Sequence, residues 1–182
     1  MGNSRIIGPS GGHTWHVSEL TYAPVGRTFT GDLPDGFRHL HYRTYLGNGD
    51  DLFRRSAEAV LTFTMHRAIG AKIDATADRA APGVRLTVGA GPLKVPCEVV
   101  WAVDEPARAG WGYGTLPGHQ ASGEEAFQVV REETGRVWFS VIAYSRPARL
   151  PMKLAGPASV LVQQAYARLL GRALKRLGTV SR

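Results

Sequence analysis

The residues best suited to chemistry lie in one short stretch that holds His119, Glu124 and Glu125. The two glutamates are adjacent in a predicted strand, so their side chains point to opposite faces of a sheet. Glu125 shares its face with Phe127, and we therefore predict that Glu125 points inward. A carboxylate that faces an apolar cavity has a raised pKa and can act as a general acid or base, with His119 as its partner. Alternatively, an arginine pairs with the inward glutamate and the pair holds the loop in place.

Three alternating residues of an earlier strand, His39, His41 and Arg43, share one face. A spacing of two places the imidazoles side by side, which suits an anionic group or a metal. No carboxylate stands at a matching offset, and alternating polar residues are also typical of a solvent face. The H-x-x-H pattern of His13 and His16 has no helix to align it. We therefore predict no metal site.

Aromatic residues are concentrated in neighbouring predicted strands: Trp101, Trp111, Tyr113, Phe127, Trp138 and Tyr144. Such a set forms either the core or the wall of a ligand pocket with a few polar anchors. The candidate ligand-binding residues are Trp111, Tyr113, Phe127, Trp138, Tyr144, Glu124, His39, His41 and Arg43. The sequence has neither a glycine-rich phosphate loop nor a G-x-S-x-G elbow. We therefore expect neither a nucleotide cofactor nor serine hydrolase activity, and we predict no cofactor of another kind.

The elements that would position these residues follow from hydrophobic periodicity. A strand is predicted at 37–46, a helix from 50 or 51 to 69, and a loop at 71–83. Further strands are predicted at 84–88, 93–103, 111–115, 124–132 and 137–145. A helix of about 20 residues begins at Pro157 and ends at Gly178. Its predicted apolar stripe consists of Leu161, Ala165, Leu169, Leu170, Ala173, Leu174 and Leu177. This order predicts an α+β fold in which a curved, mostly antiparallel sheet wraps around the C-terminal helix.

The length of 182 residues fits a single domain, predicted at 18–182 after a flexible segment at 1–17. No apolar run is long enough to span a bilayer and no secretory signal is recognised. Cys97 is the single cysteine, which favours a cytoplasmic location and excludes an internal disulfide. The net charge of +7 is scattered except at Arg168, Arg172, Lys175 and Arg176, which form either a solvated helix face or a contact for phosphate or an anionic membrane. We expect no nucleic-acid partner and leave the oligomeric state open.

The run Tyr113-Gly114-Thr115-Leu116-Pro117-Gly118-His119, followed by Gly123-Glu124-Glu125-Ala126-Phe127, resembles the DUF1990 family of uncharacterised bacterial and plant proteins. Asp104-Glu105-Pro106, Leu20-Thr21-Tyr22, Arg38-His39, Met65-His66 and Ser145-Arg146-Pro147 extend the resemblance over about residues 18–177. The family brings no assigned activity. Its element order is similar to that of the START and polyketide-cyclase helix-grip superfamily, which implies a helix-grip fold.

The sequence therefore predicts that an apolar or amphipathic small molecule binds between the C-terminal helix and the sheet. Glu125, His119 and Tyr113 would select the ligand. Two alternatives stay open: an enzyme of cyclase, dehydratase or hydrolase type that uses Glu125 or His119 in the same cavity, and a basic interaction module formed by the cluster on the last helix.

Overall fold

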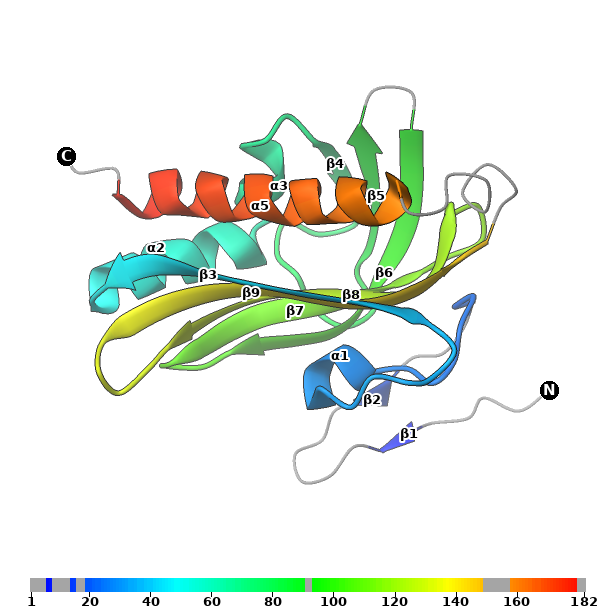
Figure 1. The fold of residues 1–182 in the computed structure, drawn as a ribbon, viewed down its shortest axis with the longest axis horizontal. Coiled ribbons are helices and arrows are strands. Elements are labelled where there is room, and N and C mark those ends of the chain that lie inside the picture. Colours follow the sequence, from blue (N-terminus) through cyan, green and yellow to red (C-terminus); the bar gives the residue numbers. More distant parts are fainter. Residues whose placement is uncertain (1–5, 8–13, 16–18, 91–92, 149–157, 180–182) are drawn as a thin grey trace.

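A seven-stranded antiparallel sheet organises the chain (Figure 1). The computed structural model describes residues 6–7, 14–15, 19–90, 93–148 and 158–179. The sheet strands are β3 (Arg38–Asn48), β4 (Lys72–Ala75), β5 (Arg85–Ala90), β6 (Leu93–Asp104), β7 (Arg108–Thr115), β8 (Ala121–Arg131) and β9 (Arg136–Pro147), in the spatial order β3-β9-β8-β7-β6-β5-β4. Short strands β1 (Ile6–Ile7) and β2 (Thr14–Trp15) pair separately. The predicted flexible segment 1–17 otherwise lies outside the described residues.

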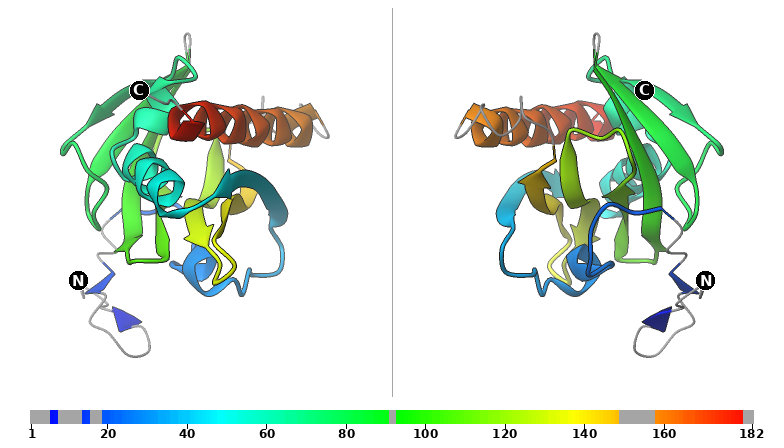
Figure 2. Two further views of the ribbon diagram at one scale, coloured as in Figure 1. Left: turned by 90° about the vertical axis from the view of Figure 1, so that its left-hand side faces the viewer. Right: turned by 90° about the vertical axis from the view of Figure 1, so that its right-hand side faces the viewer.

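Helices cover one face of the sheet (Figures 1 and 2). These are α2 (Asp50–Leu61), α3 (Thr64–Arg67) and the long α5 (Ala158–Thr179). The opposite, outer face carries α1 (Arg27–Thr30) and the chain around it. A curved antiparallel sheet that holds a C-terminal helix is the predicted α+β helix-grip architecture, which the structure confirms.

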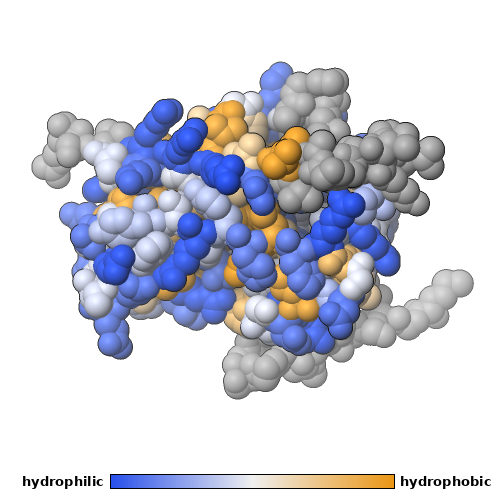
Figure 3. All heavy atoms as spheres, viewed as in Figure 1, coloured by the Kyte–Doolittle hydropathy of each residue, from blue (hydrophilic) through white to orange (hydrophobic). Residues whose placement is uncertain are grey.

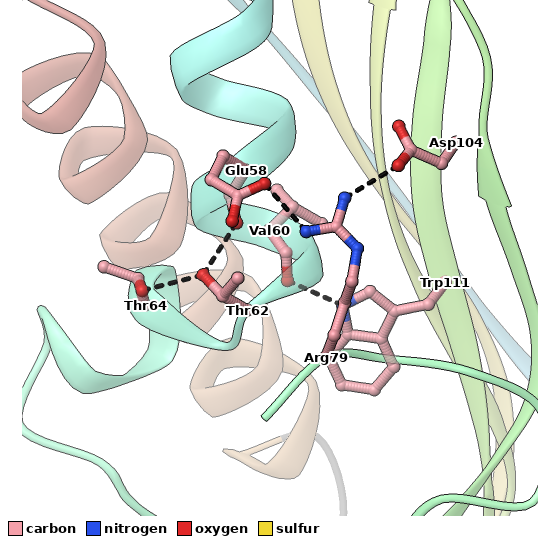
Figure 4. Close-up of polar contacts among 7 residues, drawn as sticks. All are labelled: Glu58, Val60, Thr62, Thr64, Arg79, Asp104 and Trp111. Atoms are coloured by element: carbon pink, nitrogen blue, oxygen red, sulfur yellow. Dashed lines mark hydrogen bonds and ion pairs between the residues drawn. The ribbon is translucent and has the colours of Figure 1, made fainter. Parts of the chain in front are cut away.

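The main core lies between the sheet and the helices. Alternate residues of β7, β8 and β9 point toward the helices, and Trp111, Phe127 and Phe139 are fully buried there. Trp111 also donates a hydrogen bond from Nε1 to the carbonyl oxygen of Val60, 2.9 Å away (Figure 4). Because that carbonyl lies in the last turn of α2, where helices leave carbonyls unpaired, the bond fixes the end of α2 on the sheet.

The helix predicted for residues 50–69 is interrupted. Phe63 adopts a positive φ of 61° between α2 and α3, and it is buried against Trp111 with ring centroids 5.2 Å apart. A positive φ is costly for an aromatic residue, so burial of this ring compensates for the local conformation. The predicted loop at 71–83 contains a short strand, β4, which pairs with β5.

The last helix has the predicted extent, and part of its predicted apolar stripe is buried. Leu161 and Leu169, which the sequence pattern places on the buried stripe, are 67% and 48% exposed. Leu170, Ala173 and Leu174 of the same predicted stripe are buried, together with Ala167. The pattern was wrong for Leu161 and Leu169 because apolar residues occur on both sides of α5.

A clamp on the surface joins α2 to the sheet. Arg79 donates to Glu58 of α2 and to Asp104 of β6, each over 2.7 Å (Figure 4). All three side chains are about half exposed, so we assign the clamp a modest contribution to stability.

Candidate functional site

A small cavity opens between the sheet and the first half of α5. Its volume is about 40 Å³. The residues that line it are Tyr113, Thr115, His119, Ala121, Gly123, Glu124, Glu125, Ala143, Ser145 and Gln163. The strands β7, β8 and β9 form the floor of the cavity, and α5 contributes Gln163. The volume is enough for one or two water molecules.

Glu125 is the carboxyl group of this cavity. It is half-buried and pairs across the sheet with Tyr113, whose hydroxyl donates to Glu125 Oε2 over 2.5 Å. Burial raises the pKa of Glu125, and the hydrogen bond from Tyr113 opposes this rise. Among the described residues no lysine or arginine forms an ion pair with Glu125, which differs from the arginine-paired alternative.

His119 is the second titratable group on the cavity wall. Its Nδ1 accepts a hydrogen bond from the backbone N–H of Ala121 over 3.0 Å. That bond assigns the proton of the neutral ring to Nε2. Burial lowers the pKa of His119 to about 4. Near neutral pH the imidazole is therefore uncharged and can donate from Nε2.

Aromatic rings continue from the cavity into the core. Tyr113 lies 6.0 Å from Trp111 and 6.1 Å from Phe127, measured between ring centroids. His66 of α3 follows, 4.8 Å from Phe127 and 6.4 Å from Tyr166 of α5. Through Tyr113 the cavity therefore borders an aromatic part of the core.

His66 was not among the candidates from sequence, where it resembled a helix cap or a surface group. It is 1% exposed and its Nδ1 has no hydrogen-bond partner within the described part of the chain. Burial lowers its pKa to about 3. The only signal in the sequence is its place in the helix, one residue after the buried Met65.

Glu124 lies on the outer face of the sheet and is 1% exposed. Its Oε2 accepts from the Tyr22 hydroxyl over 2.9 Å and from the Gly26 amide over 2.7 Å. Its Oε1 accepts from the amide and the hydroxyl of Thr28, and the Tyr144 hydroxyl also reaches Oε2. This carboxylate therefore fastens the segment that contains α1 onto the sheet and contributes only its backbone to the cavity.

The remaining sequence candidates are not brought to the cavity. His39, His41 and Arg43 are exposed on the outer side of β3, and Trp138 lies beside them. Arg43 stacks over Trp138 at 4.1 Å from the ring centroid and pairs with Glu132. Tyr144 is also on the outer face, against the N-terminal segment. These five residues were predicted to share a pocket with Tyr113, but the alternation of β3 and β9 turns them away from it.

The described residues also contain a charged groove, but they contain no metal cluster and no membrane-spanning helix. A wider groove of about 680 Å³ lies between α2 and the β6–β7 turn, and its walls are charged and include the Arg79 clamp. The described residues contain no group of three or more histidine, cysteine or acidic side chains placed to hold a metal ion. In the same residues no helix is long and apolar enough to cross a membrane.

Comparison with known families gives a match over most of the chain. The family described as "Domain of unknown function (DUF1990)" matches residues 21–173. A UPF0548 protein of Deinococcus radiodurans is 33% identical over 171 residues, which cover 84% of this chain and 86% of that protein. A UPF0548 protein of Arabidopsis thaliana is 30% identical over 145 residues, covering 74% of this chain and 70% of that protein.

Solved structures share the fold at low sequence identity. A hypothetical protein from Helicobacter pylori has a TM-score of 0.59 at 13% identity and covers 91% of this chain and 98% of its own. Truncated norcoclaurine synthase from Thalictrum flavum has a TM-score of 0.58 at 14% identity, with coverage of 80% and 96%. The same enzyme in complex with dopamine and hydroxybenzaldehyde has a TM-score of 0.55 at 13% identity, with coverage of 91% and 100%. At this identity the likeness is one of fold.

Proposed function

Because the chain belongs to the DUF1990 family, whose function is unknown, we propose a function from the geometry of its site. The protein binds an amphipathic small molecule in the cavity beneath the first half of α5. The Glu125–Tyr113 pair anchors the polar group of the ligand, and the rings of Trp111 and Phe127 support its apolar part. A cytoplasmic location belongs to this proposal, supported by the single buried thiol of Cys97.

One observation carries the proposal: a carboxyl group stands at the edge of an aromatic interior without a cationic partner among the described residues. Burial of a carboxyl is unfavourable unless hydrogen bonds or an opposite charge compensate for it. One tyrosine hydroxyl supplies part of that compensation. A ligand that presents an amine or a hydroxyl to Glu125 supplies the rest, and the class of ligand is therefore an aromatic or aliphatic amine or alcohol.

The cavity is too small for such a ligand as it stands, since about 40 Å³ is far below the several hundred Å³ of ordinary ligand pockets. Its roof is the first half of α5, where Leu161 and Val162 are exposed and make little contact with the sheet. From Ala167 onward the helix packs on the core through Ala167, Leu170 and Leu174. We infer that the first half of α5 lifts when a ligand enters.

The fold supports this assignment by analogy. Norcoclaurine synthase has been solved in complex with dopamine and hydroxybenzaldehyde, and dopamine is an arylalkylamine. Its fold accommodates ring-bearing ligands of the proposed class. The analogy does not extend to individual residues, because only 13% of the positions are identical.

The test is a binding titration with arylalkylamines and the matching alcohols, followed by tryptophan fluorescence and by native mass spectrometry. The variant Ala143→Leu fills the cavity with an apolar group and is expected to abolish binding. Tyr113→Phe is expected to weaken binding about tenfold, the effect of one hydrogen bond to a charged group. The exposed carboxylate of Glu105 provides the control, because Glu105→Gln is expected to bind like the unaltered protein.

The proposal fails if no amine or alcohol binds, or if Ala143→Leu binds as well as the unaltered protein while circular dichroism shows that both are folded. Equal affinities of the Tyr113→Phe variant and the unaltered protein would remove the Glu125–Tyr113 anchor.

A second candidate function is catalysis in the same cavity. The specific observation is that Glu125, with a raised pKa, and His119, with a pKa of about 4, line one wall together. A carboxyl group with a raised pKa beside a neutral imidazole suits proton transfer in a cyclisation, dehydration or hydrolysis. Glu125→Gln is then expected to abolish turnover and to leave ligand affinity nearly unchanged, whereas in a binding protein the same change alters only affinity.

A further inference from the structure

The outward face of α5 has an apolar end and a basic end. Leu161, Val162 and Leu169 expose 67%, 69% and 48% of their surface. They are the large apolar side chains recorded as exposed in the described part of the chain. Figure 3 shows apolar residues at the surface toward the N-terminal half of α5 and hydrophilic residues over its C-terminal half. The two kinds of residue therefore adjoin on one helix.

Helical geometry accounts for this face. At 100° per residue, one continuous arc of about 140° contains every exposed residue of the helix from position 161 onward. They are Leu161, Val162, Ala165, Arg168, Leu169, Arg172, Lys175, Arg176 and Thr179. The opposite arc holds the buried Ala167, Leu170 and Leu174. The helix thus presents two different faces, one to the core and one to the outside.

The charge of the outward face has a single sign. Between Ala158 and Thr179 the helix contains Arg168, Arg172, Lys175 and Arg176 and no aspartate or glutamate. None of these four appears in an ion pair among the described residues. A purely structural helix surface usually mixes both signs, which allows pairs three or four residues apart. The face therefore fits an anionic partner.

We propose that the outward face of α5 docks on an anionic membrane surface. Basic side chains attract the phosphate groups of lipids, and exposed leucine and valine side chains enter the boundary between headgroups and acyl chains. The helix lies along such a surface, since it is not apolar enough to cross it. The apolar end favours a membrane over a nucleic acid, whose phosphates would be met by the cations alone. The uniform positive charge disfavours a second copy of the same face.

Docking would place α5 between the membrane and the cavity. At 100° per residue, Gln163, which lines the cavity, lies on the side of α5 opposite Leu161. The docking itself does not depend on the cavity and can be tested without any ligand.

The experiment measures flotation of the full chain with vesicles of phosphatidylcholine alone or mixed with phosphatidylglycerol. We expect binding to the anionic vesicles only, falling steeply as salt is added. The double variant Arg168→Gln/Arg172→Gln is expected to bind about thirty-fold more weakly. Its partition coefficient should fall to between roughly a twentieth and a fiftieth of that of the unaltered protein. Leu161→Ser/Val162→Ser is expected to lose about tenfold or more, because both side chains leave water on docking.

The matched control is Arg54→Gln/Arg67→Gln, which removes two exposed positive charges from α2 and α3 and keeps the same net charge as the arginine variant on α5. It is expected to bind like the unaltered protein. An equal loss of binding in this control would overturn the proposal, because it would show that any positive charge on the protein contributes. Equal binding to neutral vesicles would also overturn it, because it would show that charge attraction plays no part. Dimers in light scattering that Leu161→Ser/Val162→Ser abolishes would assign the face to a second copy. Tight RNA binding that the serine variant leaves intact would assign it to nucleic acid, and either result rejects the membrane.

Discussion

Two consecutive residues of one type have opposite roles in this protein. Glu124 is enclosed by hydrogen-bond donors from the N-terminal segment, and Glu125 faces the cavity with one tyrosine hydroxyl. Strand alternation alone predicts that they separate, and Phe127 identifies the inward one. The donors around Glu124 could not be predicted, because they come from residues about a hundred positions earlier in the chain.

Substitution of these two glutamates should affect stability in opposite ways. Glu124→Gln replaces an acceptor oxygen with an amide NH2 group, which donates and would face the donors of Tyr22 or Thr28. We expect a loss of about 2–4 kcal/mol in the free energy of unfolding. Glu125→Gln is expected to keep or raise stability near neutral pH, because a raised pKa means that the folded state disfavours the ionised carboxyl. Urea unfolding at pH 7 measures both. Equal losses would contradict the division of roles.

His66 predicts how stability depends on pH. Its folded-state pKa of about 3 lies below the ordinary value of 6.5, so the unfolded chain binds more protons between these values. Stability is therefore complete above about pH 6.5 and falls as the pH drops toward 3. Between pH 7 and pH 5 the unaltered protein is expected to lose about 2 kcal/mol through this residue.

The variant His66→Leu tests this assignment, since it keeps an apolar side chain of similar size and cannot titrate. Urea unfolding at pH 7 and pH 5 should show a smaller loss in the variant by about the same 2 kcal/mol. The titration of His119 remains in both proteins and cancels. Parallel pH profiles would show that His66 is not the group responsible.

At the scale of elements, the outer face of β7 shows why alternate glycines occur. Gly110, Gly112 and Gly114 leave one side of the strand without side chains. A Cβ at Gly112 would meet the Trp101 ring, and one at Gly114 would meet Leu20 at 2.7 Å as well as the Tyr22 ring. Alternate glycines in a strand indicate a close approach, and the structure shows that side chains of the N-terminal segment and β6 make it.

The variant Gly114→Ala should displace the segment around Tyr22 without unfolding the inner layer. The Tyr22 hydroxyl would lose its bond to Glu124, and we expect faster amide exchange in residues 20–31 and about 2 kcal/mol less stability. Hydrogen exchange followed by mass spectrometry measures the first effect. Arg27→Ala, whose exposed side chain lies in the same segment, serves as the control. Unchanged protection of residues 20–31 in Gly114→Ala would contradict this view of the strand.

For the whole molecule, hydrophobic periodicity predicted most helices and strands. It did not predict which faces of these elements pack against one another. The strand pattern placed β6, β8 and β9 within a few residues, since alternation over ten or so positions leaves little freedom. On α5 the prediction held for Leu170 and Leu174 but was wrong for Leu161 and Leu169, which resemble core residues when neighbours are unknown. The break at Phe63 depends on a buried contact with Trp111, which is distant in sequence.

The candidate site was partly predictable, because some of its residues are close in sequence. Glu125, Tyr113 and His119 come from neighbouring strands and one loop, so local order brings them together. His39, His41 and Arg43 share a face with each other, but only the pairing of β3 with β9 shows that this face is the outer one. His66 required knowledge of how α3 packs on the sheet.

Glu124 and Glu125 are joined by a single peptide unit. At this point only the backbone of β8 separates the segment around α1 on the outer face from the cavity on the inner face. A shift of β8 that adjusts the grip on one side must tilt the carboxyl on the other. Trp101 is tied to the same point, since its indole N–H donates to the Thr28 hydroxyl, which in turn donates to Glu124 Oε1. Thr28 and Glu124 therefore connect the outer cover of the sheet to the strand that carries Glu125.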